Sequence, residues 1–420
     1  MHININPEHL TNQAAKLRVK VAELEEMAVK LTAPNQCKMA AKKIANRKGK
    51  VAVFLGAGAS KVFGWPLTSE LLPSILLGLK ANDLFEDDRI NTSKENDADR
   101  QLLRRAIAAL CPGLNIRNCF SQNYKVQLPL VTSLLTMIDF SLITGNSVIS
   151  GFTSEDTRHA RLLLERAIYE IVEHEIDALE PGYWPPREPT KLTFAFFKWL
   201  DSLRGNSKNV GVITSNYDLA VEQAWKFDRY SRDRIEESAI DLGFPWLWAS
   251  NSTEKIISRP ADPKRRLYKL HGSTNWLRCG LCDRIHINPK VDVAIYAFQR
   301  AVDDNNVCHC NHSKLEMQIV SPSFVREVRS PNLNSIWQSS LDWLRAADDW
   351  IIIGYSFPDE DINIRSLFAR AFSSRKTKIN ITTIQHGTNE QTKMRYEAFF
   401  PAERLTYLTG GLETFIKSLI

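Results

Sequence analysis

A glycine-rich turn at residues 56–60 has the composition that phosphate binding requires. It follows the apolar run 51–55, which reads as a buried strand, and its residues are Gly56, Ala57, Gly58, Ala59 and Ser60. Glycines at the end of a buried strand allow a tight turn, and they let backbone amides approach a pyrophosphate closely. Turns of small residues also occur where a strand simply packs against a helix. The turn alone therefore leaves both interpretations open.

A second polar segment, residues 214–218, directly follows the apolar run 210–213. It contains Thr214, Asn216 and Asp218, whose side chains are suited to hydrogen bonding a ribose or an attacking water. Asparagine and aspartate also cap helices, so one of them could have a purely structural use. Because the segment holds more polar residues than a cap needs, we expect the others to contact a ligand.

A histidine and a late turn could complete such a site. His271 stands between an apolar stretch and Gly272, and an imidazole titrates near neutral pH, so it could serve as a base. A lone histidine is, however, more often a structural hydrogen-bonding group. The apolar run 350–353 precedes a turn that could contact an adenosine ribose or a phosphate. Its candidate residues are Gly354, Ser356, Phe357 and Asp361.

Four of the seven cysteines lie between residues 279 and 310, in two closely spaced pairs. They are Cys279, Cys282, Cys308 and Cys310. Four thiolates can complete a tetrahedral zinc site of the closed, structural kind. His309 or His312 could replace a cysteine as a ligand, and a reduced, metal-free loop is the alternative.

The elements that must position these residues are predicted from four apolar runs, 51–55, 210–213, 350–353 and 379–384. Each run precedes a polar or glycine-containing turn, and helical patterns lie between them. We therefore predict an α/β fold with a Rossmann-like parallel sheet, helices on both faces, a large helical insertion and a small zinc-binding module. Ligands in such folds bind at the carboxyl ends of the strands, where the candidate residues stand.

The domain organisation follows from the same patterns. Residues 1–49 read as an N-terminal helical segment, and residues 50–420 as one nucleotide-binding domain. Within this domain we place the helical insertion at about residues 82–209 and the zinc module at about residues 276–315.

Composition excludes few function classes. The 54 basic and 48 acidic residues give a formal net charge of +6, which for this length does not argue for nucleic-acid binding. The opening residues lack the pattern of a secretory signal, and the longest apolar region, 128–149, is interrupted by polar residues. We expect a cytoplasmic protein that neither enters a membrane nor binds nucleic acid directly.

Taken in order, the GAG-x-S turn, the T-x-N-x-D segment, the HG pair, the cysteine cluster and the late G-x-S turn resemble the sirtuin superfamily. The resemblance runs from about residue 51 to the C-terminus. It implies that Asn216 and Asp218 lie near the nicotinamide ribose of NAD, with Asn216 positioning a water, and that His271 acts on the ribose hydroxyls. It also implies that Gly354 and Ser356 bind the adenosine side. The pyrophosphate would be held by Gly56, Ala57, Gly58 and Ser60.

Two departures point to one branch of this superfamily. Protein deacylases follow the first turn with a G-I-P-D-F-R segment, whereas residues 64–68 here are Gly-Trp-Pro-Leu-Thr. Their acylpeptide-binding F-G-E segment has no clear counterpart, the nearest candidate being residues 322–326. These departures resemble the bacterial sirtuin-like proteins of antiphage defence, which hydrolyse NAD. Since several of those are single domains of this size that work with a HerA-type ATPase, the resemblance implies such a partner.

The expected activity is hydrolysis of the bond between nicotinamide and ribose, with nicotinamide and ADP-ribose as products. A toxic enzyme of this kind must be restrained, so we expect a homo-oligomer whose activity depends on assembly. Three alternatives stay open at this point: an NAD-dependent protein deacylase or ADP-ribosyltransferase, a non-catalytic scaffold that binds NAD or ADP-ribose, and a DNA-binding module.

Overall fold

The computed structural model describes most of the chain outside the N-terminus and several connections. The described residues are 20, 27–28, 31–85, 93–115, 128–145, 151–177, 188–203, 209–226, 239–248, 255–287, 307–308, 310, 313–319, 330–359, 361–374, 378–387 and 389–420. The candidate segment 322–326 and the two histidines at positions 309 and 312 lie outside these ranges.

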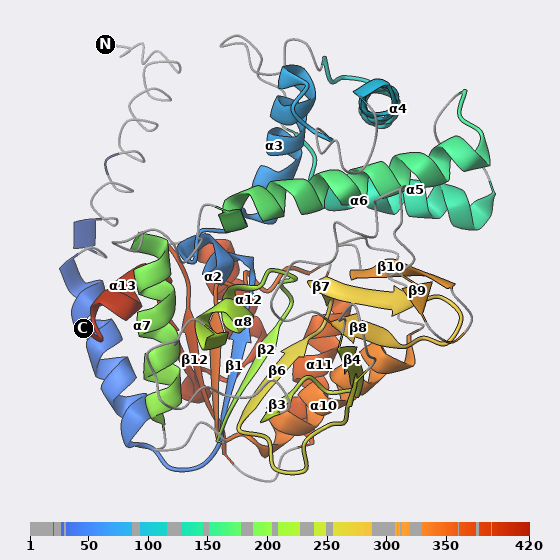
Figure 1. Cartoon of the computed structure of the whole chain (residues 1–420). Helices are drawn as coiled ribbons and strands as arrows, with labels where there is room; N and C mark the ends of the chain where they lie inside the picture. Colours follow the sequence, from blue (N-terminus) through green and yellow to red (C-terminus); the bar gives the residue numbers. More distant parts are fainter. Residues whose placement is uncertain are drawn as a thin grey trace, which may run out of the picture.

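A seven-stranded sheet forms the centre of the molecule, with strand order β13-β12-β11-β1-β2-β6-β3 (Figure 1). Every neighbouring pair in it is parallel. Its strands are β1 (Val51–Leu55), β2 (Val210–Thr214), β3 (Ile240–Asp241), β6 (Arg265–Lys269), β11 (Asp349–Ile353), β12 (Asn380–Ile384) and β13 (Leu405–Leu408). The four apolar runs in the sequence coincide with β1, β2, β11 and β12, so the predicted Rossmann-like parallel sheet is confirmed.

Helices cover both faces of this sheet, which explains why β1, β2 and β11 are buried along their whole length. On one side α10 packs against α11, and on the other α7 packs against α8 and α13. The covering helices are α2 (Ala57–Val62), α7 (Glu188–Ser202), α8 (Ala220–Lys226), α10 (Pro331–Ala346), α11 (Ile362–Ser373), α12 (Glu390–Phe399) and α13 (Gly411–Lys417), with a short 3-10 turn at Ala402–Arg404.

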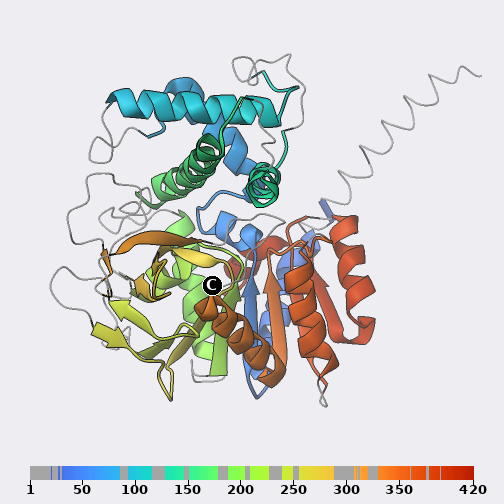
Figure 2. The same ribbon diagram turned by 90° about the vertical axis from the view of Figure 1, so that its right-hand side faces the viewer.

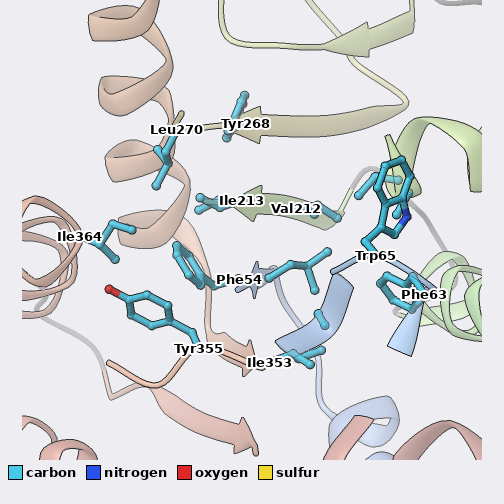
Figure 3. Close-up of a cluster of buried hydrophobic side chains, with 14 of the residues drawn as sticks. Phe54, Phe63, Trp65, Val212, Ile213, Tyr268, Leu270, Ile353, Tyr355 and Ile364 are labelled. Atoms are coloured by element: carbon cyan, nitrogen blue, oxygen red, sulfur yellow. The ribbon is translucent and has the colours of Figure 1, made fainter. Parts of the chain in front are cut away.

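The core between sheet and helices is aromatic as well as aliphatic. The ring of Phe54 on β1 meets that of Tyr355 edge to face at 5.0 Å between centroids, and both lie in the cluster drawn in Figure 3. Residues 31–46 form a helix that joins the same core through buried Cys37 and Ile44. This part of the predicted N-terminal segment therefore packs on the domain.

A second group of helices lies beyond the carboxyl ends of the strands. It comprises α3 (Thr68–Ala81), α4 (Ser93–Leu110), α5 (Val131–Thr144) and α6 (Ser154–Asp177), which pack on one another (Figures 1 and 2). We call α3 to α6 the helical group. The predicted insertion, residues 82–209, differs from this group at both ends, because α3 packs with α5 and α6 whereas α7 packs with the helices that cover the sheet.

A smaller, six-stranded sheet lies beside the main one, with strand order β5-β4-β8-β7-β10-β9. Its strands are β4 (Trp246–Trp248), β5 (Lys255–Ile257), β7 (Gly272–Cys279), β8 (Ile285–Ile287), β9 (Val307–Cys308) and β10 (Ser313–Ile319). Strand β7 starts at the residue after His271 and ends at Cys279, so it connects the two sheets.

The topology places the candidate residues at one point. Strand β1 has β11 on one side and β2 on the other, so the chain changes direction across the sheet between β1 and β11. Crevices for ligands form at the carboxyl ends of parallel strands where the strand order reverses in this way. Among the described residues, no helix is long and apolar enough to cross a membrane.

Candidate active site

A cavity of about 530 Å³ opens between the carboxyl edge of the main sheet and the helical group. This volume is in the range of small-molecule sites, which is about 300–1,000 Å³. Eight of the residues singled out from the sequence line it: Ala57, Ser60, Asn216, Asp218, His271, Gly354, Ser356 and Asp361. The fold thus brings together residues that are up to about three hundred positions apart in the chain. Five further candidates, Gly56, Gly58, Ala59, Thr214 and Phe357, do not line it.

The glycines of the first and last turns serve the contact between those two turns. The amide of Gly58 donates to the carbonyl of Gly354 at 2.8 Å. A Cβ atom on Gly56 would lie 2.6 Å from the Gly354 oxygen, and one on Gly354 would lie 2.2 Å from the Ala59 nitrogen. Gly354 also has a φ of +60°, which favours glycine. The space beside Gly56 and Gly58 is therefore filled by backbone, and it is Ala57 and Ser60 that reach the cavity.

Ser60, Asn216 and Asp218 form one hydrogen-bonded group in the cavity wall. The Ser60 hydroxyl donates to the Asp218 carboxylate, and it accepts from Nδ2 of Asn216 at 2.6 Å. The same Nδ2 donates to the carbonyl of Gly56 at 2.9 Å. Both amide hydrogens of Asn216 are thus used within the wall, and its remaining polar atom is Oδ1, an acceptor.

Thr214 and Asp218 also have structural uses. The Thr214 hydroxyl donates to the carbonyl of Leu55 at 3.0 Å and accepts from the amide of Asn216 at 3.0 Å, which fixes the turn beneath the cavity. Asp218 accepts from the amide of Ala220, the first residue of α8, at 3.0 Å. Asp218 therefore has the helix-capping role that was considered from the sequence, and it also lines the cavity.

His271 is 6% exposed and lines the cavity. Its Nδ1 lies 2.9 Å from the carbonyl of Ser215, and because a carbonyl can only accept, Nδ1 carries the hydrogen. In the neutral imidazole this tautomer leaves the lone pair on Nε2. The ring faces Trp337 of α10, with 6.5 Å between ring centroids.

In the late turn, which follows β11, some residues line the cavity and others lie in the core. Gly354, Ser356 and Asp361 line the cavity, and the Tyr355 hydroxyl donates to the Asp361 carboxylate at 2.9 Å. Phe357 instead has no exposed surface, and its ring packs among aromatic residues such as Phe399 at 4.6 Å between centroids. Its φ of +53° turns the chain so that this side chain points into the core. The structure therefore does not bring Phe357 to the cavity.

The helical group supplies part of the wall that sequence patterns did not reveal. Leu130, Thr132 and Ser133, at the start of α5, line the cavity together with Val172 of α6. No motif marks these residues, because only the packing of α5 against α3 and α6 brings them here. Their one signal in the sequence is a pair of hydroxyl residues near the start of the apolar region 128–149.

Two aromatic residues of the wall also escaped the sequence analysis. Trp65, which is 2% exposed, has an indole N–H with no hydrogen-bond partner among the described residues. A buried donor of this kind is one that a ligand can satisfy. Burial and the neighbouring Asp218 carboxylate raise the pKa of the Tyr217 phenol, so this side chain stays protonated at neutral pH and is available as a donor.

The four cysteines converge at the end of β7, as their spacing suggested. Their Sγ atoms all lie within 4.8 Å of one another, and the Cys279–Cys310 and Cys282–Cys308 pairs are each 3.6 Å apart. A disulfide bond measures about 2.05 Å, so these pairs are not bonded. Four thiolates at about 2.3 Å from a tetrahedral zinc would lie about 3.8 Å apart, so the cluster fits this metal. Burial opposes ionisation of Cys279, but hydrogen bonds from the Cys282 and Leu281 amides lower its pKa to about 7.

Comparisons with known proteins agree with part of this arrangement. A SIR2-like domain family matches residues 210–400, a little under half of the chain. No protein of curated function matches the sequence.

The solved structures that match this chain include several Sir2 proteins. One, from work on the mechanism and regulation of Sir2 enzymes, has 13% identity, a TM-score of 0.38, and 91% of this chain and 95% of that chain covered. A Sir2–p53 peptide–NAD+ complex has 12% identity and a TM-score of 0.38, with 90% and 94% covered. Residues 210–400, which contain Asn216, His271, the four cysteines and Gly354, are thus similar to a SIR2-like domain.

Proposed function

We propose that the cavity binds NAD and that the protein hydrolyses its nicotinamide–ribose bond, which releases nicotinamide and ADP-ribose. One observation carries the proposal. Asn216 and His271, which follow the neighbouring strands β2 and β6, line the same cavity, and Nδ1 of His271 binds the carbonyl of Ser215, the residue before Asn216. The similarity of residues 210–400 to a SIR2-like domain supports the choice of NAD as the substrate.

In this proposal Asn216 orients the attacking water. Because Nδ2 donates to Gly56 and Ser60, the side chain cannot rotate without breaking two hydrogen bonds. Its Oδ1 accepts a hydrogen from the water, whose lone pair then faces the ribose carbon. Cleavage proceeds through an oxocarbenium-like state, and the main contributions of the protein are positioning and electrostatics.

His271 takes the role of the base. Its Nδ1–H donates to Ser215, so Nε2 is the atom that contacts the ribose hydroxyls and accepts a proton. Asp218 fixes the wall through Ser60 and places a negative charge beside the site, which stabilises positive charge developing on the ribose.

The remaining wall residues bind the rest of NAD. The two turns meet at Gly58 and Gly354, and each gives a residue to the cavity wall, Ala57 and Ser356, where the pyrophosphate and the adenosine ribose would lie. The hydroxyl hydrogen of Ser60 is already given to Asp218, so Ser60 contributes shape more than a donor to the phosphates. Asp361 would accept from an adenosine hydroxyl.

The cysteine cluster would hold a structural zinc, bound by Cys279, Cys282, Cys308 and Cys310, that takes no part in the cleavage. For the biological role we propose depletion of NAD in bacterial antiphage defence by a cytoplasmic homo-oligomer that acts with a HerA-type ATPase. This role follows the resemblance seen in the sequence, above all the replacement of the deacylase segment by Gly-Trp-Pro-Leu-Thr at residues 64–68.

The test is nicotinamide release from NAD by the purified protein, alone and with a co-encoded ATPase, with and without an acylated peptide. We expect release without peptide, with free ADP-ribose as the second product. Release that requires the peptide and yields an acylated ADP-ribose would replace the proposal by a deacylase. NAD binding without any release would leave a non-catalytic binder.

A further inference from the structure

Four hydrogen bonds join the loop that carries Asn216 to the segment that carries His271. The acceptors are the carbonyl oxygens of the end of β2 and of the loop that follows it. Thr214 accepts from the amide of Leu270 at 2.9 Å, Ser215 from Nδ1 of His271 at 2.9 Å, and Tyr217 from the amide of Thr274 at 3.0 Å. The fourth acceptor is the carbonyl of Asp218, and its donor is the ammonium group of Lys269. Three of these bonds are thus made by the backbone or by His271 itself, and one by a charged side chain.

Lys269 is the last residue of β6 and has no exposed surface. Besides the Asp218 carbonyl, its Nζ contacts Oε1 of Glu222 at 2.9 Å and the hydroxyl of Ser273 at 2.7 Å. An ammonium group has three hydrogens, so each has one acceptor. The acceptors belong to three different elements: the loop after β2, helix α8 and strand β7. Lys269 does not line the cavity, so it does not touch the substrate.

We propose that Lys269 is a positioning residue that fixes Asn216 relative to His271, and this inference rests on the hydrolysis proposed above. Asp218 is two residues after Asn216, and Ser273 is two residues after His271. Because the Nζ atom of Lys269 binds both Asp218 and Ser273, it fixes the distance between the two segments. A misplacement of about 1 Å in a catalytic group costs about 100-fold in rate, so loss of Lys269 should lower kcat strongly.

The composition of this cluster favours positioning over simple packing. A buried lysine is costly unless it is paired, and an apolar side chain would fill the same space without that cost. Glu222, whose side chain is 13% exposed, offsets the charge. No apolar residue could bind three acceptors from one point. The buried charge therefore serves the geometry that it imposes on loop, helix and strand.

The experiment removes the ion pair as a unit, with Lys269→Met combined with Glu222→Gln, because removal of one partner alone would leave a buried unpaired charge. The matched control is Arg265→Met with Asp201→Asn, which deletes an ion pair at the opposite end of the same strand, where Nη2 and Oδ2 are 2.6 Å apart. For both double variants we would measure the melting temperature, NAD affinity by calorimetry, kcat, and the ¹⁵N signals of the His271 imidazole.

We expect the Lys269/Glu222 variant to be folded, to bind NAD with an affinity within about threefold of the original, and to lose about 100-fold in kcat. Its His271 Nδ1–H signal should exchange faster, since the hydrogen bond to Ser215 is no longer held in place. In the control, the NAD affinity, kcat and the His271 Nδ1–H signal should stay as they are in the original protein. An unchanged kcat together with an unchanged imidazole signal would overturn the inference. If the unaltered protein does not turn over NAD, the hydrolysis proposal fails, and the imidazole signals alone then decide on Lys269.

Discussion

The two ends of strand β7 lie in regions that are held together in different ways. At its start, the cavity wall around Asn216 and His271 is fixed by hydrogen bonds within the chain and by the contact of two glycine turns. At its end, the cysteine cluster has a small core of its own, whose buried members are Leu277, Cys279, Cys308 and Leu315. Four thiol groups within 4.8 Å of one another are the main feature of that end.

The two regions therefore depend on different interactions for their stability. The wall of the cavity is preorganised by the polypeptide, because the side chains of Ser60, Asn216, Asp218 and His271 are all held by hydrogen bonds within the chain. Among the described residues the cysteine end has only a small buried core, so we propose that a metal ion supplies the stabilisation that a larger core supplies elsewhere. We therefore expect the site to depend on its turns directly, and on zinc only through β7.

The largest effect should come from the contact of the two turns. In Gly354→Ala the new Cβ would lie 2.2 Å from the nitrogen of Ala59, at a φ that favours glycine. We expect a loss of about 3 kcal/mol or more in the free energy of unfolding, measured by denaturant titration. Gly113→Ala is the control, because nothing lies within 4 Å of its Cβ position. Equal stability of the two variants would mean that the turns are not in contact as described.

The next effect concerns the cysteine end. Removal of zinc by a chelator, or Cys282→Ser, should expose the amides of β8, β9 and β10 to hydrogen exchange while β1 and β11 stay protected. Nicotinamide release should fall by about tenfold, because β7 then loses support at one end. Cys111→Ser, which changes a cysteine outside the cluster, should leave both the hydrogen exchange and the nicotinamide release unchanged. Loss of protection throughout the main sheet would show that the two regions lose their structure together.

A smaller effect should come from the helical group. Thr132→Ala combined with Ser133→Ala removes two hydroxyls that line the cavity without changing its shape much. If they contact NAD, KM should rise by about fivefold to tenfold, as for the loss of one or two hydrogen bonds, while kcat stays nearly constant. Thr136, one turn further along α5 and not part of the lining, gives the control Thr136→Ala. A fall in kcat instead would assign the hydroxyls to the reaction itself.

The smallest effect is a pH dependence of stability that arises from Asp241, a buried residue that does not line the cavity. Asp241 accepts from Arg259 at 2.9 Å and from the Tyr268 hydroxyl at 2.8 Å. Burial alone would raise its pKa, but the hydrogen bonds from Arg259, the Gly243 amide and Tyr268 hold it below the usual value. A lowered pKa in the folded state stabilises the protein above the unfolded value of about 3.9, and this stabilisation is lost as the pH falls through the folded pKa.

Asp241→Asn should therefore cost about 1–2 kcal/mol at pH 7, and the difference from the unaltered protein should shrink below about pH 4. Chemical denaturation at several pH values measures this. A difference that is constant down to pH 2 would contradict the assigned cause. Nicotinamide release at pH 7 should not change, because Asp241 does not line the cavity.

The sequence predicted the main sheet well, because its strands are short apolar runs followed by glycine or polar turns. It also identified eight residues of the cavity wall, since parallel strands bring the turns at their carboxyl ends together. The glycines were harder to interpret. Gly56 and Gly354 are needed for a contact between two turns that are about three hundred residues apart in the chain, and no local pattern reveals that contact.

Three other features could not be predicted for physical reasons. Phe357 follows a hydroxyl residue in an open turn, but its positive φ directs the ring into the core. Thr132 reaches the cavity only through the packing of one helix on others. Lys269 belongs to a residue type that is almost always exposed, and only the tertiary structure supplies the three acceptors that allow its burial.

The central claim is that Asn216 and His271 act together on NAD in this cavity. The most direct measurement compares NAD binding by calorimetry with the rate of nicotinamide release for the unaltered protein, Asn216→Ala and His271→Ala, in the assembled form. We expect each variant to bind NAD with an affinity within about tenfold of the original and to lose at least about 100-fold in kcat, as for a general base or a water-positioning group. Full release by either variant, or no NAD binding by the unaltered protein, would contradict the claim.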